Sequence, residues 1–447
     1  MSLPRYPRYK DSGVERLGKV PEHWELPPLY LRYAVDLGKM LDTKTLTGKH
    51  SVSYLRNVDV QWDSINVDNL PLIDIPPEEH DRFSLRVGDL LVCEGGEVGR
   101  SAIWKGQLDS CSFQKALHRL RPLSRREHPR FFFYCLRFAA DLSLFIADGN
   151  PNTIDHLTGE KLRRYRFPVP PSQEQLQIAE FLDRETIKID ALVAEQQRLM
   201  ELLKEKRQAF ISHAVTKGLN PHSPMKQSGV DWLGVVPAHW DVKPIKHVIT
   251  LRSGGTPSKA TLEFWDGDVP WASSKDLKTE LLGDTEDHIT QKAVADGAAA
   301  LVRAGSILVV VRGMILAHTF PVAKTLCPMA INQDLKALEP SRCLTTDFLA
   351  WLLRGSSNET LRRTDEAGHG TKVLRLEAWT SMPLPIPPIA EQDAIVDAIC
   401  SGLNQIDLLA AEARRAIDLL QERRTALISA AVTGQIDVRG LANSEAA

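Results

Sequence analysis

Two long stretches of the chain carry apolar residues at intervals of three and four, which is the pattern of one face of an α-helix. The first stretch follows Pro168–Pro171, where Ser172 can cap a helix, and the second follows Pro385–Pro388. The stripes at the start of the two stretches match position by position: Ile178, Ala179 and Leu182 in the first, and Ile395, Val396 and Ile399 in the second.

Small residues interrupt the second stripe at Ser401 and Gly402. A glycine inside a helix costs about 1 kcal/mol relative to alanine. We therefore expect each helix to break or bend, near residues 183–186 and 400–403, and a longer helix to follow each break.

Beyond these points the apolar residues keep the a/d spacing of a coiled-coil seam, with charged residues on the flanking faces. The predicted seam is Ile189, Leu192, Gln196, Leu199, Leu203 and Phe210 in the first helix and Ile406, Leu409, Ala413, Ala416, Leu420 and Leu427 in the second. About 30 residues at about 1.5 Å each make a rod of about 45 Å, comparable to the roughly 34 Å of one DNA turn. Near-identical helices predict an antiparallel pair about a pseudo-twofold axis, with the domains that they carry at opposite ends. The alternative is that each helix packs only on its own domain.

The segments that precede the two helices have the pattern of mixed α+β domains. Short β-rich runs bounded by glycine, such as Gly88–Cys93 and Gly305–Val311, predict strands in both. Aligned on these runs, Phe113–Leu117 matches Ile331–Leu335, and Gly149–Thr153 matches Gly368–Thr371. The predicted fold is therefore two similar α+β domains joined by a pair of long antiparallel coiled-coil helices with internal pseudo-twofold symmetry.

These patterns belong to a repeat, because Lys10–Trp24 returns as Lys226–Trp240 and Pro168–Leu219 returns as Pro385–Ile436. A repeat of this length indicates a duplication. The framework was kept while the two blocks that it carries diverged, as expected if one scaffold holds two different readers. The predicted parts are a lead-in (1–24), a first domain (25–167), a central helical region (168–223), a repeated lead-in (224–240), a second domain (241–384) and a C-terminal helical region (385–447).

Composition adds little to this picture and excludes some classes. The 447 residues are 43% hydrophobic and 25% charged, with a net charge of −2, which is ordinary for a globular protein. Without an apolar run of 18 residues or a signal-peptide core, the sequence predicts a soluble, cytoplasmic protein. The cysteines form no Cys-x-x-Cys pair and are expected to be buried, reduced thiols: Cys93, Cys111, Cys135, Cys327, Cys343 and Cys400.

Basic residues gather in two places in the first domain. A nearly neutral domain can still bind DNA if its basic residues share one face, because phosphate neutralisation is local. The alternative is a solvated loop. The clusters are His118, Arg119, Arg121, Arg125, Arg126, His128 and Arg130, and then Lys161, Arg163, Arg164 and Arg166.

No catalytic motif stands out. Asn150–Thr153 lacks the second proline and the aromatic residue of an amino-methyltransferase motif and reads as a turn, with DNA contact as the alternative. Gly13–Lys19 imitates a phosphate loop, but Val20 replaces the Ser or Thr that would hold magnesium. His23 and His239, each beside a tryptophan, are expected to pack in the lead-ins and not to bind metal.

The sequence resembles the specificity subunit of a type I restriction-modification system. The resemblance rests on the paired Pro-x-Pro-Pro-x-x-Glu-Gln and Ala-Val-Thr segments, the Gly-x-x-Pro-x-His-Trp lead-ins, and the run Leu251–Ser258 followed by Phe264–Trp271. It covers essentially the whole chain. The first domain departs from the pattern, since Leu37–Leu41 stands where the second has Gly-Gly-Thr-Pro.

This resemblance implies a DNA-reading subunit without catalysis of its own, whose two target-recognition domains each bind one half of a split, asymmetric site. In the family, two modification subunits join it to make an adenine-N6 methyltransferase that uses S-adenosylmethionine. Two restriction subunits can add ATP- and Mg-dependent translocation and cleavage. The helices would set the length of the spacer between the half-sites and dock the modification subunits.

Candidate DNA contacts follow from residue type, since Arg and Lys suit guanine, Asn and Gln suit adenine, and amides and hydroxyls suit phosphate. The alternative for any one of them is a hydrogen-bonded turn or solvated surface. In the first domain they are Tyr54, Arg56, Asn57, Glu94, Gly95, Gly96, Arg100, Gln114, Lys115 and Asn152. In the second they are Thr256, Ser258, Lys259, Ser273, Ser274, Lys275, Arg312, Gly313, Asn332, Gln333, His369, Thr371 and Lys372.

Two rival functions remain open at this point. A self-contained methyltransferase or nuclease would bind cofactor or turn over DNA as a purified chain, and the missing motifs speak against it. A scaffold that binds only proteins would bind no DNA even with a modification subunit supplied.

Overall fold

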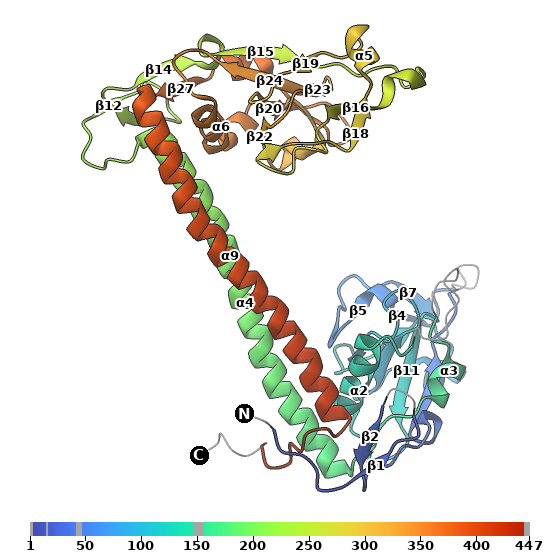
Figure 1. Ribbon diagram of the computed structural model, residues 1–447. Coiled ribbons are helices and arrows are strands. Elements are labelled where there is room, and N and C mark those ends of the chain that lie inside the picture. The colour runs from blue at the N-terminus through green and yellow to red at the C-terminus, as the bar shows by residue number, and fades with distance from the viewer. Residues whose placement is uncertain (1–2, 15–16, 42–46, 146–155, 442–447) are drawn as a thin grey trace. The chain divides into compact units, whose positions relative to one another are not determined.

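The computed structural model describes residues 3–14, 17–41, 47–145 and 156–441. The chain forms two compact units, one of residues 1–196 with 415–447 and the other of residues 197–414. Two long helices, α4 (Ser172–Lys217) and α9 (Ile389–Val432), each contribute one part to each unit (Figure 1).

The α+β domain of the first unit is built on two sheets. One sheet has the strand order β3-β11-β8-β9 and the other β10-β4-β7. The helix α2 (Pro129–Asp141) follows β11 and contributes a row of buried aromatic residues to the core. The remaining elements are β1 (Tyr9–Asp11), β2 (Lys19–Pro21), β3 (Tyr33–Leu37), β4 (Ser51–Leu55), β5 (Val60–Gln61), β6 (Ser64–Ile65), β7 (Leu72–Asp74), α1 (His80–Phe83), β8 (Leu90–Cys93), β9 (Ser101–Ile103), β10 (Ser112–Phe113), β11 (Leu117–Pro122) and α3 (Gly159–Arg164).

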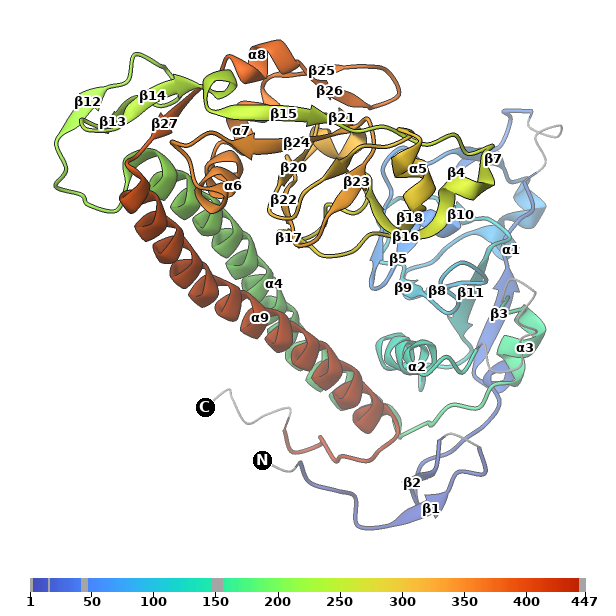
Figure 2. The ribbon, with the colours of Figure 1, turned by 45° about the horizontal axis from the view of Figure 1, so that its top comes forward.

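The α+β domain of the second unit has the same plan (Figure 2). Its main sheets run β15-β24-β20-β22-β17 and β18-β16-β23-β19, and α6 (Thr346–Gly355) follows β24. The first strands and helix are β12 (Met225–Gln227), β13 (Val235–Pro237), β14 (Asp241–Pro244), β15 (Ile249–Ser253), β16 (Trp265–Ala272), β17 (Leu281–Leu282), β18 (Asp287–Ile289), α5 (Gln291–Ala295) and β19 (Leu301–Val302). The later ones are β20 (Ile307–Val310), β21 (Arg312–Gly313), β22 (Val322–Thr325), β23 (Met329–Ile331), β24 (Leu335–Pro340), α7 (Ser357–Leu361), β25 (Thr364–Glu366), β26 (Lys372–Leu374), α8 (Leu376–Thr380) and β27 (Pro383–Ile386).

The two domains therefore share a topology, as predicted from their glycine-bounded runs. The order β3-β11-β8-β9 in one is the order β15-β24-β20-β22 in the other. In both smaller sheets one pair is parallel, β4 with β10 and β16 with β23, and the other is antiparallel. The second domain adds β17 and β19 at the sheet edges and a third small sheet of β21, β26 and β25.

The helices α4 and α9 pair antiparallel within each unit. In the first unit Arg424 forms an ion pair with Asp190 at 3.1 Å, and in the second Arg207 forms one with Asp407 at 3.5 Å. Both pairs fit one antiparallel register, and they are equivalent positions of the repeat. One described helix, α9, is long and apolar enough to span a membrane by length and composition alone. Ile406, Ala413 and Ile417 of this helix are buried, whereas Leu408, Leu409 and Leu419 are exposed.

The predicted seam needs correction at three leucines. Ile189, Leu203 and Ile406 are buried, whereas Leu192, Leu199 and Leu409 are 52%, 39% and 54% exposed. The predicted a and d positions were assigned from the leucines, and these three leucines do not lie between the helices. The residues between the helices are instead a narrower stripe that includes the half-buried Val193, Met200 and Ala410 and the buried Ala413 and Ile417.

The predicted breaks in the helices are wrong, because α4 is helical throughout Ser172–Lys217 and α9 throughout Ile389–Val432. Gly402 has a packing role instead. A Cβ at this position would lie 2.5 Å from Cε1 of Phe210 on α4. The glycine lets the phenylalanine ring approach the backbone of α9.

In each unit the Glu-Gln motif at the start of the long helix binds both the lead-in and the α+β domain. In the first unit Glu174 accepts hydrogen bonds from the Trp24 indole (2.9 Å) and the Tyr6 hydroxyl, and lies 2.9 Å from Nε2 of His23. Gln175 accepts from the backbone N–H of His128 at 2.9 Å. In the second unit Glu391 binds Trp240 (3.0 Å) and His239 (2.7 Å), and Gln392 accepts from the N–H of Thr345 (2.8 Å).

Candidate nucleic-acid interface

Three connections of the first domain meet at one end of its sheets. We call them loop cluster 1: residues 56–59 after β4, residues 94–100 after β8, and residues 114–116 between β10 and β11. Asn57 holds them together, since its Nδ2 donates to the carbonyl oxygens of Gly95 (3.1 Å) and Ala116 (3.4 Å). Arg100 in turn donates to Oδ1 of Asn57 at 3.0 Å. Residues predicted from separate parts of the sequence are thereby brought side by side.

The members of loop cluster 1 differ in what they leave available. Lys115 and Gly96 are exposed, and Lys115 has no side-chain hydrogen bond or ion pair to another described residue. Arg56 is half-buried and donates to both carboxylate oxygens of Asp59, at 2.9 and 2.8 Å. The Asp59 carboxyl, desolvated but bound by Arg56, has a pKa lowered from its ordinary value by these hydrogen bonds. Arg56 therefore closes the turn, and Asn57 and Arg100 position it.

One predicted contact of the first domain, Tyr54, does not belong to this surface. Tyr54 is 4% exposed and packs in a small core with Ile73, Ile75 and Phe83, so its prediction as a DNA contact is wrong. Its neighbour Leu55 is also buried, in a different core cluster on the opposite face of β4, so strand alternation alone could not have shown that Tyr54 is covered. Gln114 is half-buried, and its backbone N–H bonds β4. Asn152 lies outside the described residues.

The second domain forms loop cluster 2 from residues 254–259, 273–276, 312–314 and 332–334. The Thr256 hydroxyl donates to Oε1 of Gln333, and both side chains are exposed. Ser273 is buried and bonds Asp276 through its N–H and hydroxyl, at 2.8 Å each. Ser274 lies beside Gly313, since a Cβ on that glycine would be 3.9 Å from the serine Oγ.

Further candidates surround loop cluster 2. Arg312 is exposed at the end of β20, on the short strand β21, which pairs with β26 so that Gly313 faces Lys372. Lys275 is bound to Asp287 (3.0 Å) and Glu286 (3.3 Å), and these carboxylates raise its pKa. Ser258, Lys259 and His369 are exposed, and Thr371 is half-buried. Asn332 is buried and accepts from the Asp334 N–H at 3.1 Å, which makes it a turn residue.

The same backbone hydrogen bonds support both clusters. In the first domain they are Lys39 N to Phe113 O (3.0 Å), Gln114 N to Leu55 O (3.0 Å), Leu117 N to Gln114 O (2.9 Å) and Leu157 N to Glu94 O (2.8 Å). In the second they are Gly255 N to Ile331 O (2.9 Å), Asn332 N to Ala272 O (2.9 Å), Leu335 N to Asn332 O (3.3 Å) and Leu374 N to Val311 O (2.8 Å). Gly38 and Gly254 lie against the same crossing, where a Cβ would meet backbone oxygens at 2.3 and 2.0 Å. We call this shared set the backbone frame.

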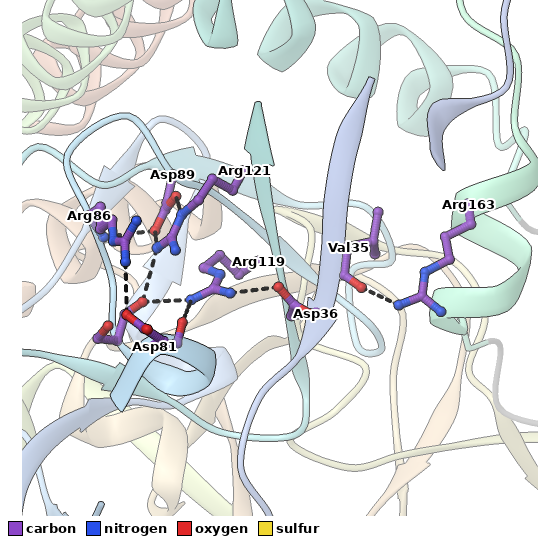
Figure 3. Close-up of polar contacts among 9 residues, drawn as sticks. Val35, Asp36, Asp81, Arg86, Asp89, Arg119, Arg121 and Arg163 are labelled. Atoms are coloured by element: carbon purple, nitrogen blue, oxygen red, sulfur yellow. Dashed lines mark hydrogen bonds and ion pairs between the residues drawn. The ribbon is translucent and has the colours of Figure 1, made fainter. Parts of the chain in front are cut away.

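Two arginines of the first predicted basic cluster, Arg119 and Arg121, bind carboxylates and carbonyls within the domain (Figure 3), whereas Arg125 and Arg126 of this cluster are exposed. Arg119 is 3% exposed and binds Asp36 at 2.5 Å and the carbonyl of Ser84 at 2.7 Å. Arg121 binds Asp89 at 2.6 Å, and the Arg86 side chain reaches Asp81 at 3.0 Å. These bonds tie β3, β11 and the loop before β8 together.

Some of the other basic residues of the two clusters also contact groups of the first unit. Arg130 binds Asp183 of α4 at 2.7 Å and a second carboxylate, Asp63. Burial lowers the pKa of His118, whose Nε2 lies 2.6 Å from the carbonyl oxygen of Leu157. In the second predicted cluster Arg163 donates to the Val35 carbonyl (Figure 3), Arg166 donates to the Leu26 carbonyl at 2.9 Å, and Arg164 pairs with Glu160 at 2.7 Å.

Among the described residues, no group of three or more His, Cys, Asp and Glu could hold a metal ion. The six cysteines are unpaired: three are buried, Cys327 and Cys343 are half-buried, and Cys400 is exposed, which corrects the prediction that all are buried.

The repeated arrangement has a counterpart among known proteins. The model of the type I restriction modification DNA specificity domain matches the chain twice, over residues 35–201 and 237–416. The chain belongs to this family. Each match contains one loop cluster and the beginning of one long helix.

Relatives in the specificity family support the assignment at low sequence identity. The chain is 28% identical to the EcoR124I/EcoR124II specificity subunit of Escherichia coli over 53% of this chain and 55% of that protein. It is 23% identical to the putative MjaX specificity subunit of Methanocaldococcus jannaschii over 96% and 98%. The alignment with the E. coli relative therefore spans about half the length of each protein.

Solved structures show the same fold. A chain from a study of complex assembly and conformational transition of the type I R-M system matches with a TM-score of 0.71 at 15% identity, over 92% of this chain and 98% of that one. The HsdS subunit of Thermoanaerobacter tengcongensis matches with a TM-score of 0.54 at 17% identity, over 93% and 98%. The predicted fold class, two α+β recognition domains with paired helices, is confirmed.

Sequence reasoning missed the residues that build the specificity domains from within. Asp59 and Asp276 close equivalent turns by accepting from the N–H three residues earlier, at 2.7 and 2.8 Å. An Asp at the fourth position of each short turn was the available signal. Glu174 and Glu391 were noticed only as repeat markers, because sequence spacing cannot show that a residue contacts a lead-in about 150 positions earlier.

Proposed function

We propose that this chain is the DNA-reading subunit of a type I restriction-modification complex, in which each recognition domain reads one half of a bipartite, asymmetric site. The observation that carries the proposal is the backbone frame, which occurs in both domains while the exposed side chains on it differ. A common support with different exposed groups is what two readers of different sequences require. The recognition domains are residues 25–167 and 241–384, and the rest is spacer and attachment.

The DNA-contacting set in this proposal is the exposed part of the two clusters. From the first domain it includes Gly96 and Lys115, with Asn57 and Arg100 as supports. From the second it includes the exposed Thr256, Gln333 and Arg312, with the exposed Ser258 and Lys259 and the half-buried Lys372 at the periphery. Backbone amides at the glycines suit phosphates, and the side chains suit base edges.

Methylation would come from partner subunits. Two modification subunits would supply S-adenosylmethionine and adenine-N6 transfer, and two restriction subunits, where the host has them, would supply ATP- and Mg-dependent cleavage. Exposed leucines support attachment along the helices, because they recur at equivalent positions of the repeat: Leu192 with Leu409, and Leu202 with Leu419. Apolar residues at such positions are typical of a surface that packs against further helices.

Attachment of the modification subunits can be tested by substitutions in the two long helices. Replacing Leu192 and Leu409 by serine should weaken co-purification with the modification subunit, whereas the same change at the exposed, polar pair Glu201 and Asp418 should not. Equal binding by both double variants would contradict attachment through the leucines.

The spacer proposal also has a sharp form. Because α4 and α9 pair antiparallel, extra length must enter both helices at one level, for example seven residues after Gln196 and seven after Asp418. Seven residues add about 10 Å of helix, or about 3 base pairs. The methylated motif should keep both half-sites and gain that spacer. An unchanged spacer would contradict the role of the helices.

The function itself is tested by mapping adenine methylation in the host genome with the gene present and deleted. We expect methylation at one bipartite motif to disappear on deletion. A purified chain that methylates or cuts DNA unaided would favour the rival enzyme. A chain that binds no DNA even with its modification subunit would favour a protein-binding scaffold.

A further inference from the structure

The backbone frame identifies a matched pair of residues, one in each domain. The bond from Leu117 N to Gln114 O closes a four-residue turn with Lys115 at its first corner. The bond from Leu335 N to Asn332 O closes the equivalent turn with Gln333 at the same corner. Both corner residues are exposed. The backbone frame therefore places Lys115 and Gln333 at equivalent positions of the two domains.

The supports around each corner fix the backbone. In the first domain Asn57 donates to the carbonyl of Ala116, the residue after Lys115, and is itself held by Arg100. In the second, the side chain of Asn332 accepts from the Asp334 N–H and so tightens the turn around Gln333. A corner fixed in this way can present a long side chain to a base edge at a reproducible position.

The two corner side chains have different hydrogen-bonding capacity. A lysine ammonium has only donors, which match the O6 and N7 acceptors of guanine. A glutamine amide has a donor and an acceptor, which match N7 and the N6 amino group of adenine. Because the Thr256 hydroxyl donates to Oε1 of Gln333, it orients the amide and leaves a second oxygen lone pair and both N–H groups for a base.

We propose that this corner is a base-reading position in both domains, with Lys115 selecting guanine in one half-site, Gln333 selecting adenine in the other, and Thr256 positioning Gln333. The inference rests on the proposed function, since it presumes that both domains read DNA. It goes further by naming the position, the base and the domain. A phosphate contact from Lys115 is the alternative, and it would affect all sequences equally.

The test uses the full chain with its modification subunit, and reads both the genomic methylation motif and the binding preference for DNA with one randomised half-site. Lys115→Gln should change one position of the first half-site from guanine to adenine, and Gln333→Lys should do the reverse in the second. The preference at that position should change roughly 5- to 150-fold, the range of a good bidentate contact. The other half-site should stay unchanged in each case.

Three further variants separate base reading from other effects. Lys115→Arg keeps guanine chemistry and should keep the motif, while Lys115→Met should lose preference at that one position. Thr256→Val should relax the adenine preference while the thermal unfolding midpoint stays unchanged. If Lys115→Gln weakens binding to all sequences equally, or if the motif survives both exchanges, the proposal is overturned. A wild-type complex with no bipartite motif would instead refute the proposed function.

Discussion

The Glu174 carboxylate offers a direct measure of how the lead-in is held in the first unit. It accepts from Tyr6 and Trp24, which are 4% and 0% exposed, and contacts His23, which is partly exposed and can be rehydrated. Glu174→Ala leaves two buried donors without their partner. Each costs about 1–3 kcal/mol, so the lead-in should be destabilised by about 2–6 kcal/mol.

The second unit supplies a matched comparison. Glu391 binds the buried Trp240 and the exposed His239, and its own side chain is 30% exposed. Glu391→Ala therefore leaves one buried donor, worth at most about 1–3 kcal/mol. Glu180→Ala, at an exposed position of α4, should change stability by less than about 0.5 kcal/mol.

Hydrogen–deuterium exchange of the full chain measures these effects locally. A loss of 2 kcal/mol or more should speed exchange of the 3–24 amides by at least about 30-fold in Glu174→Ala. Exchange of the 226–240 amides should rise less in Glu391→Ala. If Glu174→Ala exchanges in its lead-in no faster than Glu180→Ala, the carboxylate does not hold this segment and the reasoning fails.

Three further predictions concern packing, thiols and pH. Gly402→Ala should destabilise the helix pair by up to about 2 kcal/mol, because overpacking against Phe210 costs about 1–3 kcal/mol and the better helix propensity of alanine offsets about 1 kcal/mol. In a Phe210→Leu background the same change should stabilise the pair. Destabilisation in both backgrounds would contradict the contact. Alkylation of the native chain should modify the exposed Cys400 first, whereas burial raises the pKa of Cys135 to about 12 and protects it; equal rates measured by mass spectrometry would contradict this. Burial lowers the pKa of His118 below 6.5, so the unfolded state binds the proton more readily and the first unit loses stability as the pH falls below about 6.5. When the pH is lowered from 7.5 to about 5.5, hydrogen–deuterium exchange of residues 157–164 should rise more in the wild type than in His118→Phe. Equal rises would contradict the linkage.

The sequence predicted the fold well where the repeat supplied two independent readings. The strands β8 and β20 lie within the predicted glycine-bounded runs, and the matched segments Phe113–Leu117 and Ile331–Leu335 occupy equivalent places. The predicted breaks in the long helices rested on local propensity alone, and they were wrong. Gly402 signalled a break by its local propensity, but the neighbouring helix supplies Phe210, and tertiary packing outweighed about 1 kcal/mol.

The candidate site was predicted by residue type, which proved informative only in part. Asn57, Gly95, Arg100 and Lys115 come together as one cluster. The basic residues around Arg119 instead form buried ion pairs, because charge along a strand does not reveal which carboxylates face it from other strands. Burial, and not composition, separates the exposed candidates from the residues that support the loops.

The central claim is that two independent readers share one framework. It is tested most directly by replacing residues 241–384 with the second recognition domain of another family member and mapping the methylated motif in cells that supply the modification subunit. We predict that one half-site changes to that of the donor protein while the other half-site and the spacer remain. A change in both half-sites would contradict the claim.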